Sequence, residues 1–135
     1  MDHPFFDCVQ YLSEEDYANL IQYIDNLKNN IKNDKMLIFY GPRKTGKTSL
    51  KNAIRCYLGQ NQCYDIIGRD CMNSPIRKVF FKTEIDEIQK ADVQFFINLI
   101  HYKQSIISET NHIENVDDRL LKNSIVINMN NVFTN

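Results

Sequence analysis

Long uninterrupted apolar runs are absent from this sequence, because charged residues or Asn break every candidate. A membrane-spanning helix needs roughly 20 consecutive apolar residues, so none is expected. The N-terminus, Met1–Asp7, also lacks the basic region and the apolar core of a signal peptide. We therefore expect an intracellular protein that is neither secreted nor membrane-bound, located in the cytoplasm or the nucleus.

Close cysteine pairs are absent as well. Zinc ribbons and thioredoxin-like sites use such pairs, so we expect reduced cysteines in core or surface positions. An excess of positive charge is also lacking, since the formal net charge is −1 and the pI is near 6.3. A surface devoted as a whole to nucleic acid is therefore excluded, although a local basic patch is not. The four cysteines are Cys8, Cys56, Cys63 and Cys71.

The length of 135 residues allows one domain with a sizeable core. Ser13 is a good helix N-cap, and apolar residues then recur at helical spacing from Tyr17 to Ile31. We divide the chain into an N-terminal helical segment, 1–35, and a core, 36–135.

The most specific motif is Gly41–Thr48, read as Gly-Pro-Arg-Lys-Thr-Gly-Lys-Thr. The run Met36–Tyr40 before it is typical of a buried parallel strand, and Ser49–Leu58 after it is typical of a helix that ends at Gly59. Strand, glycine-rich loop and helix are the context that a phosphate-binding P-loop requires. The motif therefore predicts an α/β P-loop NTPase with a parallel sheet flanked by helices.

Each residue type in this loop has a physical task. Gly41 and Gly46 let the backbone N–H groups surround phosphate oxygens. Lys47 reaches the β- and γ-phosphates, and the Thr48 hydroxyl ligates Mg²⁺. We expect ATP and Mg²⁺ as cofactors, held by the contiguous residues Gly41, Pro42, Arg43, Lys44, Thr45, Gly46, Lys47, Thr48 and Ser49.

A second, acidic motif should follow another apolar strand and act on Mg²⁺ and the attacking water. The short run Val79–Phe81 is the best candidate strand, and Glu84 is the predicted catalytic and metal-binding acid. Asp86 and Glu87 are competitors for this role. The alternative is that these acids only open the next helix, where negative charge is favourable.

Two further segments complete the pattern. Alternating apolar stretches around Thr110-Asn111-His112 indicate a hairpin with His112 near its tip. The run Ser124–Asn130 is typical of a strand that ends in Asn, and such an Asn can orient the water that attacks the γ-phosphate. Asn130 is preferred, while Asn128 and Asn131 compete with it.

The order of these parts resembles the superfamily 3 helicases of DNA viruses. The layout of Ile106–Asn131 is similar to papilloma- and polyomavirus initiator helicases, and Gly41–Leu58 with Glu84 is similar to poxvirus-type primase-helicases. The resemblance implies a modified AAA+ fold and hexameric rings with ATP between subunits. It also implies Lys47, Glu84 and Asn130 as catalytic residues, with His112 on a hairpin that follows single-stranded DNA.

The family also uses an arginine from a neighbouring subunit, and none stands in the expected place here. The chain ends soon after the Asn motif, so we expect the last strand and the arginine-finger region to be lacking. The main hypothesis is the ATPase core of a viral-type replicative DNA helicase. The alternatives are a shortened regulatory module that binds ATP with little turnover and, with less support, a small P-loop kinase.

Overall fold

The computed structural model describes residues 12–42, 46–66, 79–101 and 105–129. The predicted N-terminal helix, central strand and P-loop helix are all present. The elements in chain order are α2 (Glu14–Lys28), β1 (Met36–Tyr40), α3 (Lys47–Leu58), η1 (Gln60–Gln62), β2 (Cys63–Asp65), β3 (Val79–Lys82), η3 (Ile85–Glu87), α4 (Lys90–His101), β4 (Ser105–Thr110), η4 (Ile113–Asn115), α5 (Asp118–Lys122) and β5 (Ser124–Asn128), where η denotes a short 3₁₀ helix.

The strands form one parallel five-stranded sheet in the order β2-β3-β4-β1-β5. Strand β1 is flanked by β4 on one side and by β5 on the other, with Phe39 in register with Glu109 and with Ile127. Because the strands are parallel, their carboxyl ends meet at one edge of the sheet. The loop that follows β1 therefore lies between the residues that follow β4 and β5.

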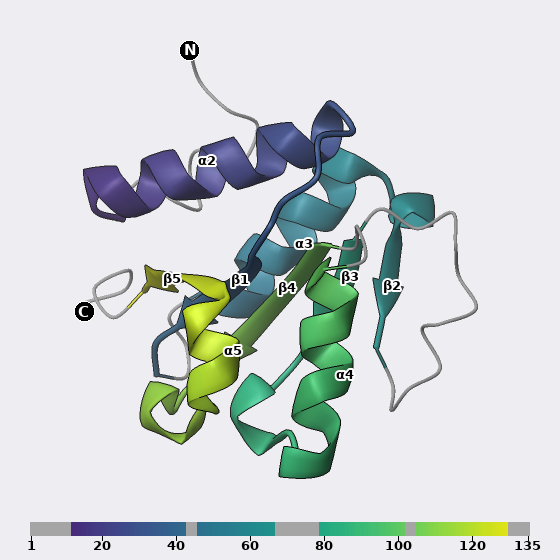
Figure 1. Cartoon of the computed structure of the whole chain (residues 1–135). Coiled ribbons are helices and arrows are strands. Elements are labelled where there is room, and N and C mark those ends of the chain that lie inside the picture. Colours follow the sequence, from purple (N-terminus) through teal and green to yellow (C-terminus); the bar gives the residue numbers. More distant parts are fainter. Residues whose placement is uncertain (1–11, 43–45, 67–78, 102–104, 130–135) are drawn as a thin grey trace.

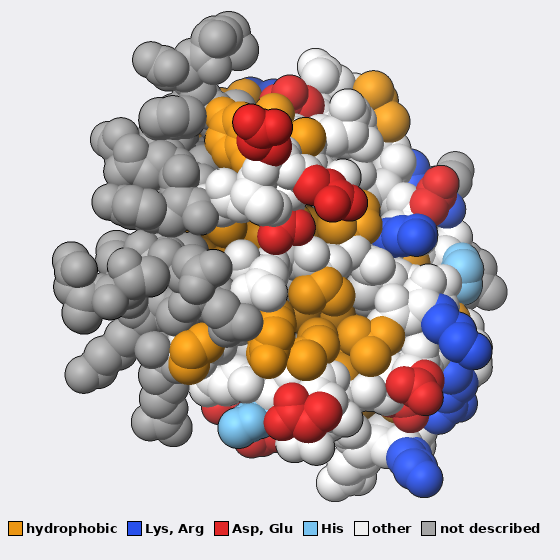
Figure 2. All heavy atoms as spheres, turned by 90° about the vertical axis from the view of Figure 1, so that its left-hand side faces the viewer, with side chains coloured by type: hydrophobic (Ala, Val, Ile, Leu, Met, Phe, Trp, Pro, Cys, Tyr) orange, Lys and Arg blue, Asp and Glu red, His pale blue; other side chains and the backbone are white. Residues whose placement is uncertain are grey.

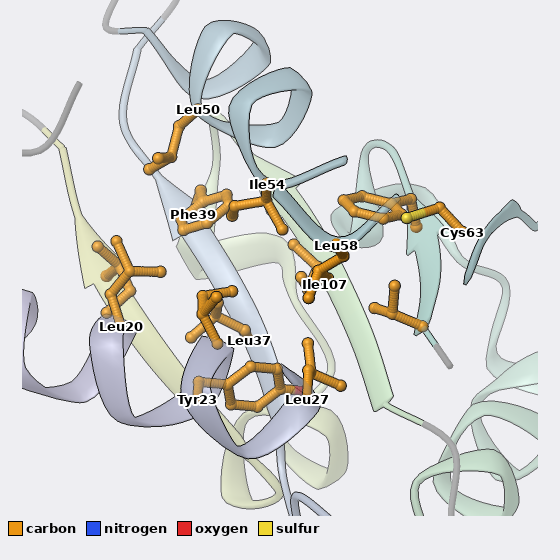
Figure 3. Close-up of a cluster of buried hydrophobic side chains, with 14 of the residues drawn as sticks. Leu20, Tyr23, Leu27, Leu37, Phe39, Leu50, Ile54, Leu58, Cys63 and Ile107 are labelled. Carbon is orange, nitrogen blue, oxygen red and sulfur yellow. The ribbon is translucent and has the colours of Figure 1, made fainter. Parts of the chain in front are cut away.

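Helices cover both faces of this sheet (Figure 1). On one face, α2 and α3 pack on side chains of β1 and β4 such as Leu37 and Ile107 (Figure 3). On the other face, α4 and α5 pack on alternate side chains of the same strands, such as Ile38 and Ile106. This alternation explains why β1 is an unbroken apolar run, since both of its faces are buried.

Helix α2 is tied to the sheet by polar as well as apolar contacts. Ser13 caps it as predicted, accepting a hydrogen bond from the Asp16 N–H. The buried Tyr23 hydroxyl shares its one proton between the carbonyls of Lys35, at 2.8 Å, and of Ile106, at 3.2 Å. Burial raises the pKa of this phenol well above its usual value. The N-terminal helix therefore shares the core with β1 and β4.

The hairpin expected around Thr110-Asn111-His112 is wrong. Residues 105–110 form β4, which pairs in parallel with both β1 and β3, and the chain then enters η4 and α5. Polar residues beside apolar ones, such as Ser105 and Ser108, favour a half-exposed strand, but both serines are buried. Alternation therefore suggested a half-exposed hairpin where the chain forms a central strand.

Other predicted elements differ in detail. The acidic segment after β3 is a separate turn, η3, and the long helix α4 begins only at Lys90. Within α4 the rings of Phe95 and Phe96 make an edge-to-face contact, and Phe96 is buried as expected for a core residue. Neither β2 nor α5 was predicted. Over the described residues, no helix has the length and apolar character needed to cross a bilayer.

Candidate nucleotide-binding site

The candidate site begins where β1 ends. The Gly41 N–H donates to the Thr110 carbonyl at 3.3 Å, so the start of the loop is fixed to the end of β4. Gly46 has a φ of 92°, a left-handed conformation that glycine adopts without strain, and α3 begins at the next residue. Arg43, Lys44 and Thr45 lie outside the described residues. Both ends of the predicted P-loop thus have the expected strand-to-helix geometry.

Lys47 is the first residue of α3 and is only 8% exposed. Its Nζ donates to the carbonyls of Gly41, at 2.5 Å, and Pro42, at 2.7 Å. Burial lowers the pKa of this ammonium group, while the nearby Glu109 carboxylate acts in the opposite direction. The cation is therefore held inside the loop, where a phosphate group with negative charge would be a better partner than neutral carbonyls.

Thr48 and Ser49 follow Lys47 in the first turn of α3 and are exposed. The first backbone N–H groups of a helix have no intrahelical acceptor, and they carry partial positive charge. The Thr48 hydroxyl at this position is a suitable oxygen ligand for a hard cation such as Mg²⁺. The N-terminal end of α3 therefore offers backbone N–H groups for an anion and a hydroxyl for a divalent ion bound to that anion.

Three acids follow β3, and they differ in surroundings. Glu84 is exposed and adopts a left-handed conformation with a φ of 48°. A side-chain hydrogen bond in which Glu84 accepts, together with the negative charge of Glu84, raises the pKa of the exposed Glu87. Asp86 instead accepts a hydrogen bond from the Thr110 hydroxyl at 2.5 Å. The backbone carbonyl of the same Thr110 accepts a hydrogen bond from the Gly41 N–H. Of the alternatives open at the sequence level, Asp86 is therefore the acid connected to the P-loop.

The end of β4 supplies a residue that sequence reasoning missed. Asn111 directly follows Thr110, and β4 lies between the P-loop strand and the strand of the acidic motif. This position is at the same edge of the sheet as the start of the P-loop, because the Thr110 carbonyl accepts a hydrogen bond from the Gly41 N–H. The hairpin interpretation concealed this position. The sequence offered little indication, because Asn111 follows the polar residues Ser108, Glu109 and Thr110, whereas Asn130 ends an apolar run.

Asn130 itself lies outside the described residues. The preceding Met129 donates its N–H to the Tyr40 carbonyl at 2.7 Å, so β5 also ends beside β1. The competitor Asn128 is exposed, and its N–H donates to the Asp16 side chain of α2. Asn131 is also outside the described part of the chain. Asn111 and Asn130 therefore stay as the two candidates for a phosphate-contacting amide.

His112 lies just beyond the end of β4 and not at a hairpin tip. Its side chain is 60% exposed, and its Nδ1 lies 3.5 Å from the Glu114 carboxylate. Without the hairpin, the argument that this residue follows a DNA strand loses its structural basis.

A buried ion pair close to the P-loop was also not predicted. Lys51 lies one turn after Lys47 in α3, and its Nζ is 3.2 Å from Glu109 Oε1 of β4. The sequence did contain an indication, because Lys51 shares the buried face of α3 with Leu50 and Ile54. A lysine on an apolar helix face requires a partner, and β4 supplies it.

The described residues contain no group of three His, Cys, Asp or Glu side chains that could hold a metal ion. Magnesium is commonly bound by one or two protein oxygens together with substrate phosphates. Thr48 and Asp86 offer a hydroxyl and a carboxylate of this kind at the same edge of the sheet. They fit a metal that arrives with a nucleotide.

No protein-family model matches the sequence, and no curated protein matches it. Solved structures do match the fold. The RuvB Holliday junction branch migration motor of Thermotoga maritima aligns with a TM-score of 0.64 and 14% identity over 87% of this chain and 45% of that chain. The AAA domain of FIGL-1, solved with ADP, aligns with a TM-score of 0.60 and 13% identity, covering 94% and 56% of the two chains.

The chain has an AAA+ P-loop NTPase fold. A variant of the same RuvB gives a TM-score of 0.68 at 17% identity, covering 90% of this chain and 47% of that one. The chain therefore spans about half the length of these proteins. At such identities the likeness shows the fold, and it agrees with the AAA+ part of the resemblance drawn from the sequence.

Proposed function

We propose that this chain binds Mg-ATP at Gly41–Thr48 and hydrolyses it as the motor core of a ring-forming DNA helicase of viral superfamily 3 type. The observation that carries the proposal is the buried Lys47, whose ammonium group points into the loop between β1 and α3. A buried ammonium group whose hydrogen bonds go to the neutral carbonyls of Gly41 and Pro42 would bind an anionic phosphate more strongly than these carbonyls. The AAA+ fold, shared with a branch migration motor, supports the motor role.

In this proposal each residue of the site has its own role in binding or hydrolysing Mg-ATP. Lys47 and the N–H groups of the loop offset the phosphate charge, and the Thr48 hydroxyl holds Mg²⁺. Asp86 replaces Glu84 as the preferred acid, because its carboxylate is connected through Thr110 to the loop. Asn111 or Asn130 contacts the γ-phosphate or the attacking water. Hydrolysis in a ring would also need a cation from a neighbouring subunit.

The test is binding and turnover with and without Lys47. Wild-type protein should bind Mg-ADP and Mg-ATP in calorimetry, and Lys47→Ala should lose this binding. ATP hydrolysis should rise on addition of single-stranded DNA and vanish in the same variant. Transfer of phosphate to a nucleoside or a metabolite instead of water would overturn the motor proposal in favour of a kinase.

The second candidate, a regulatory module with little turnover, is favoured by the described arginines. Arg55 pairs with Asp65 and lies over the Phe81 ring, at 3.9 Å from its centroid. Arg119 pairs with Asp117 at 3.2 Å. Both are engaged within their own chain, and Arg43, Arg69 and Arg77 lie outside the described residues. Nucleotide binding without hydrolysis at high protein concentration would support this module.

A further inference from the structure

The ion pair between Lys51 and Glu109 lies close to the P-loop, since Lys51 is one helical turn after Lys47 and Glu109 precedes Thr110, which accepts a hydrogen bond from the Gly41 N–H. Its two side chains are only 7% and 15% exposed, and it joins the second turn of α3 to the strand next to β1. Removing two charges from water is costly, and apolar residues of similar volume at such positions are often equally stable or more stable. Stability alone therefore gives little reason for charged groups here.

The Glu109 carboxylate is only half satisfied. Oε1 faces Lys51, whereas Oε2 is buried and has no hydrogen-bond partner among the residues that the structure describes. The same carboxylate acts electrostatically on Lys47, the group that faces the phosphates. A buried carboxylate thus exerts its charge on both lysines of the P-loop helix, at a site that otherwise favours anions.

We propose that Glu109 is a positioning residue that weakens phosphate binding: its negative charge attracts the two ammonium groups and opposes a bound di- or triphosphate. This inference rests on the proposed nucleotide site. Two lysines and one carboxylate leave one net positive charge close to the loop. Neutralising Glu109 doubles that charge, and neutralising Lys51 removes it. A weakened grip on the phosphates favours release of the diphosphate product.

The test compares three variants by calorimetric titration with Mg-ADP. Glu109→Gln keeps the size of the side chain, and we expect it to bind ADP about tenfold more tightly than wild type, from one unit charge acting through a partly buried medium. Lys51→Met should bind about tenfold less tightly, for the same reason with the opposite sign. The double variant Lys51→Met/Glu109→Gln should bind more tightly than Lys51→Met alone.

Chemical denaturation separates this effect from a purely structural one. Either single variant leaves one buried charge without its partner, so both should unfold at lower denaturant than wild type, and the double variant should recover part of the loss. Glu109→Gln is then less stable yet binds more tightly, a combination that a merely structural residue does not produce. Binding by Glu109→Gln that equals or falls below wild type would overturn the inference.

Two outcomes need separate treatment. If Glu109→Gln does not fold, the comparison of Lys51→Met with the double variant decides, and equal ADP affinities of these two would overturn the inference. The proposed nucleotide site itself is wrong if wild-type protein binds no ADP. It is also wrong if the Lys47→Ala variant binds ADP with the same affinity as wild type. Failure of the site and failure of the positioning role are thus distinguishable.

Discussion

Asp86 and Glu84 stand two residues apart, but the chain turns between them and gives them different surroundings. Glu84 adopts a left-handed conformation at the surface, whereas Asp86 is directed to the Thr110 hydroxyl. Residue chemistry alone could not rank the two carboxylates, because either can bind Mg²⁺ or activate water. The preference for Asp86 over Glu84 follows from the path of the backbone after β3.

The first prediction compares these acids. Asp86→Asn should lower ATP turnover by at least about a hundredfold, since a general base or water-orienting group contributes that much or more. Glu84→Gln is the matched control and should change turnover only a few-fold, because its side chain is exposed. Steady-state hydrolysis at saturating Mg-ATP gives the measurement. The reverse order of the two effects would return the catalytic role to Glu84.

The second prediction concerns the amide after β4. Asn111→Ala should reduce ATP hydrolysis by roughly ten- to a hundredfold, with little change in ADP affinity, because in the proposed site this residue would contact only the terminal phosphate or its water. Asn115→Ala is a suitable control, since Asn115 lies in η4 and is exposed. A loss confined to Asn130→Ala would instead assign the phosphate contact to the end of β5.

Among the elements, α2 shows how the segment 1–35 relates to the P-loop core. Its buried residues Leu20 and Ile24 belong to the same cluster as Leu37 of β1 and Leu50 of α3 (Figure 3). The Tyr23 hydroxyl adds a hydrogen bond to β4. Removing this helix would expose the part of this sheet face that α3 does not cover, so we expect the helix and the core to unfold as one unit.

The third prediction tests this unit. Leu20→Ala should lower the free energy of unfolding by about 2–5 kcal/mol, the usual cost of emptying a fully buried leucine site. The control is Ile31→Ala, at a residue that is 55% exposed, and it should cost less than about 0.5 kcal/mol. Urea denaturation followed by circular dichroism should show a single transition in each case. A separate early transition for the helix would contradict one cooperative unit.

At the scale of the whole molecule, charge is spread unevenly over the surface. On the face shown in Figure 2, Asp and Glu side chains lie above and below an apolar patch, while Lys and Arg side chains gather along the right-hand edge. The formal net charge of −1 therefore hides the separation of acidic and basic side chains into different regions of the surface. Nucleic acid would have to contact a local basic region, or the inner surface of a ring that concentrates such regions.

The fourth prediction concerns assembly. If active sites are completed between subunits, the ATPase rate per molecule should rise with protein concentration until rings are saturated. Single-stranded DNA should shift this rise to lower concentration, because a ligand that binds the assembled form stabilises it. The measurement is the hydrolysis rate over a wide protein titration, with sedimentation at the same concentrations. A constant rate per molecule would favour a self-sufficient enzyme.

The nucleotide loop and its immediate context could be predicted from the sequence. Met36–Tyr40, Gly46, Lys47 and the helix to Leu58 were predictable because strand, loop and helix are local in the chain. The same is true of α2, whose N-cap and apolar spacing are local patterns. The α/β class with a parallel sheet followed from these elements, and the structure confirms it.

Which later residues lie beside the loop depends instead on long-range strand pairing. The position of β4 between β1 and β3 depends on pairing of distant segments, and it changed a predicted hairpin into a central strand. This placement connected Asp86 to Gly41 through Thr110 and buried Glu109 beside Lys51. Local periodicity cannot carry such information, because a strand between two others and a half-exposed strand can share one alternating pattern.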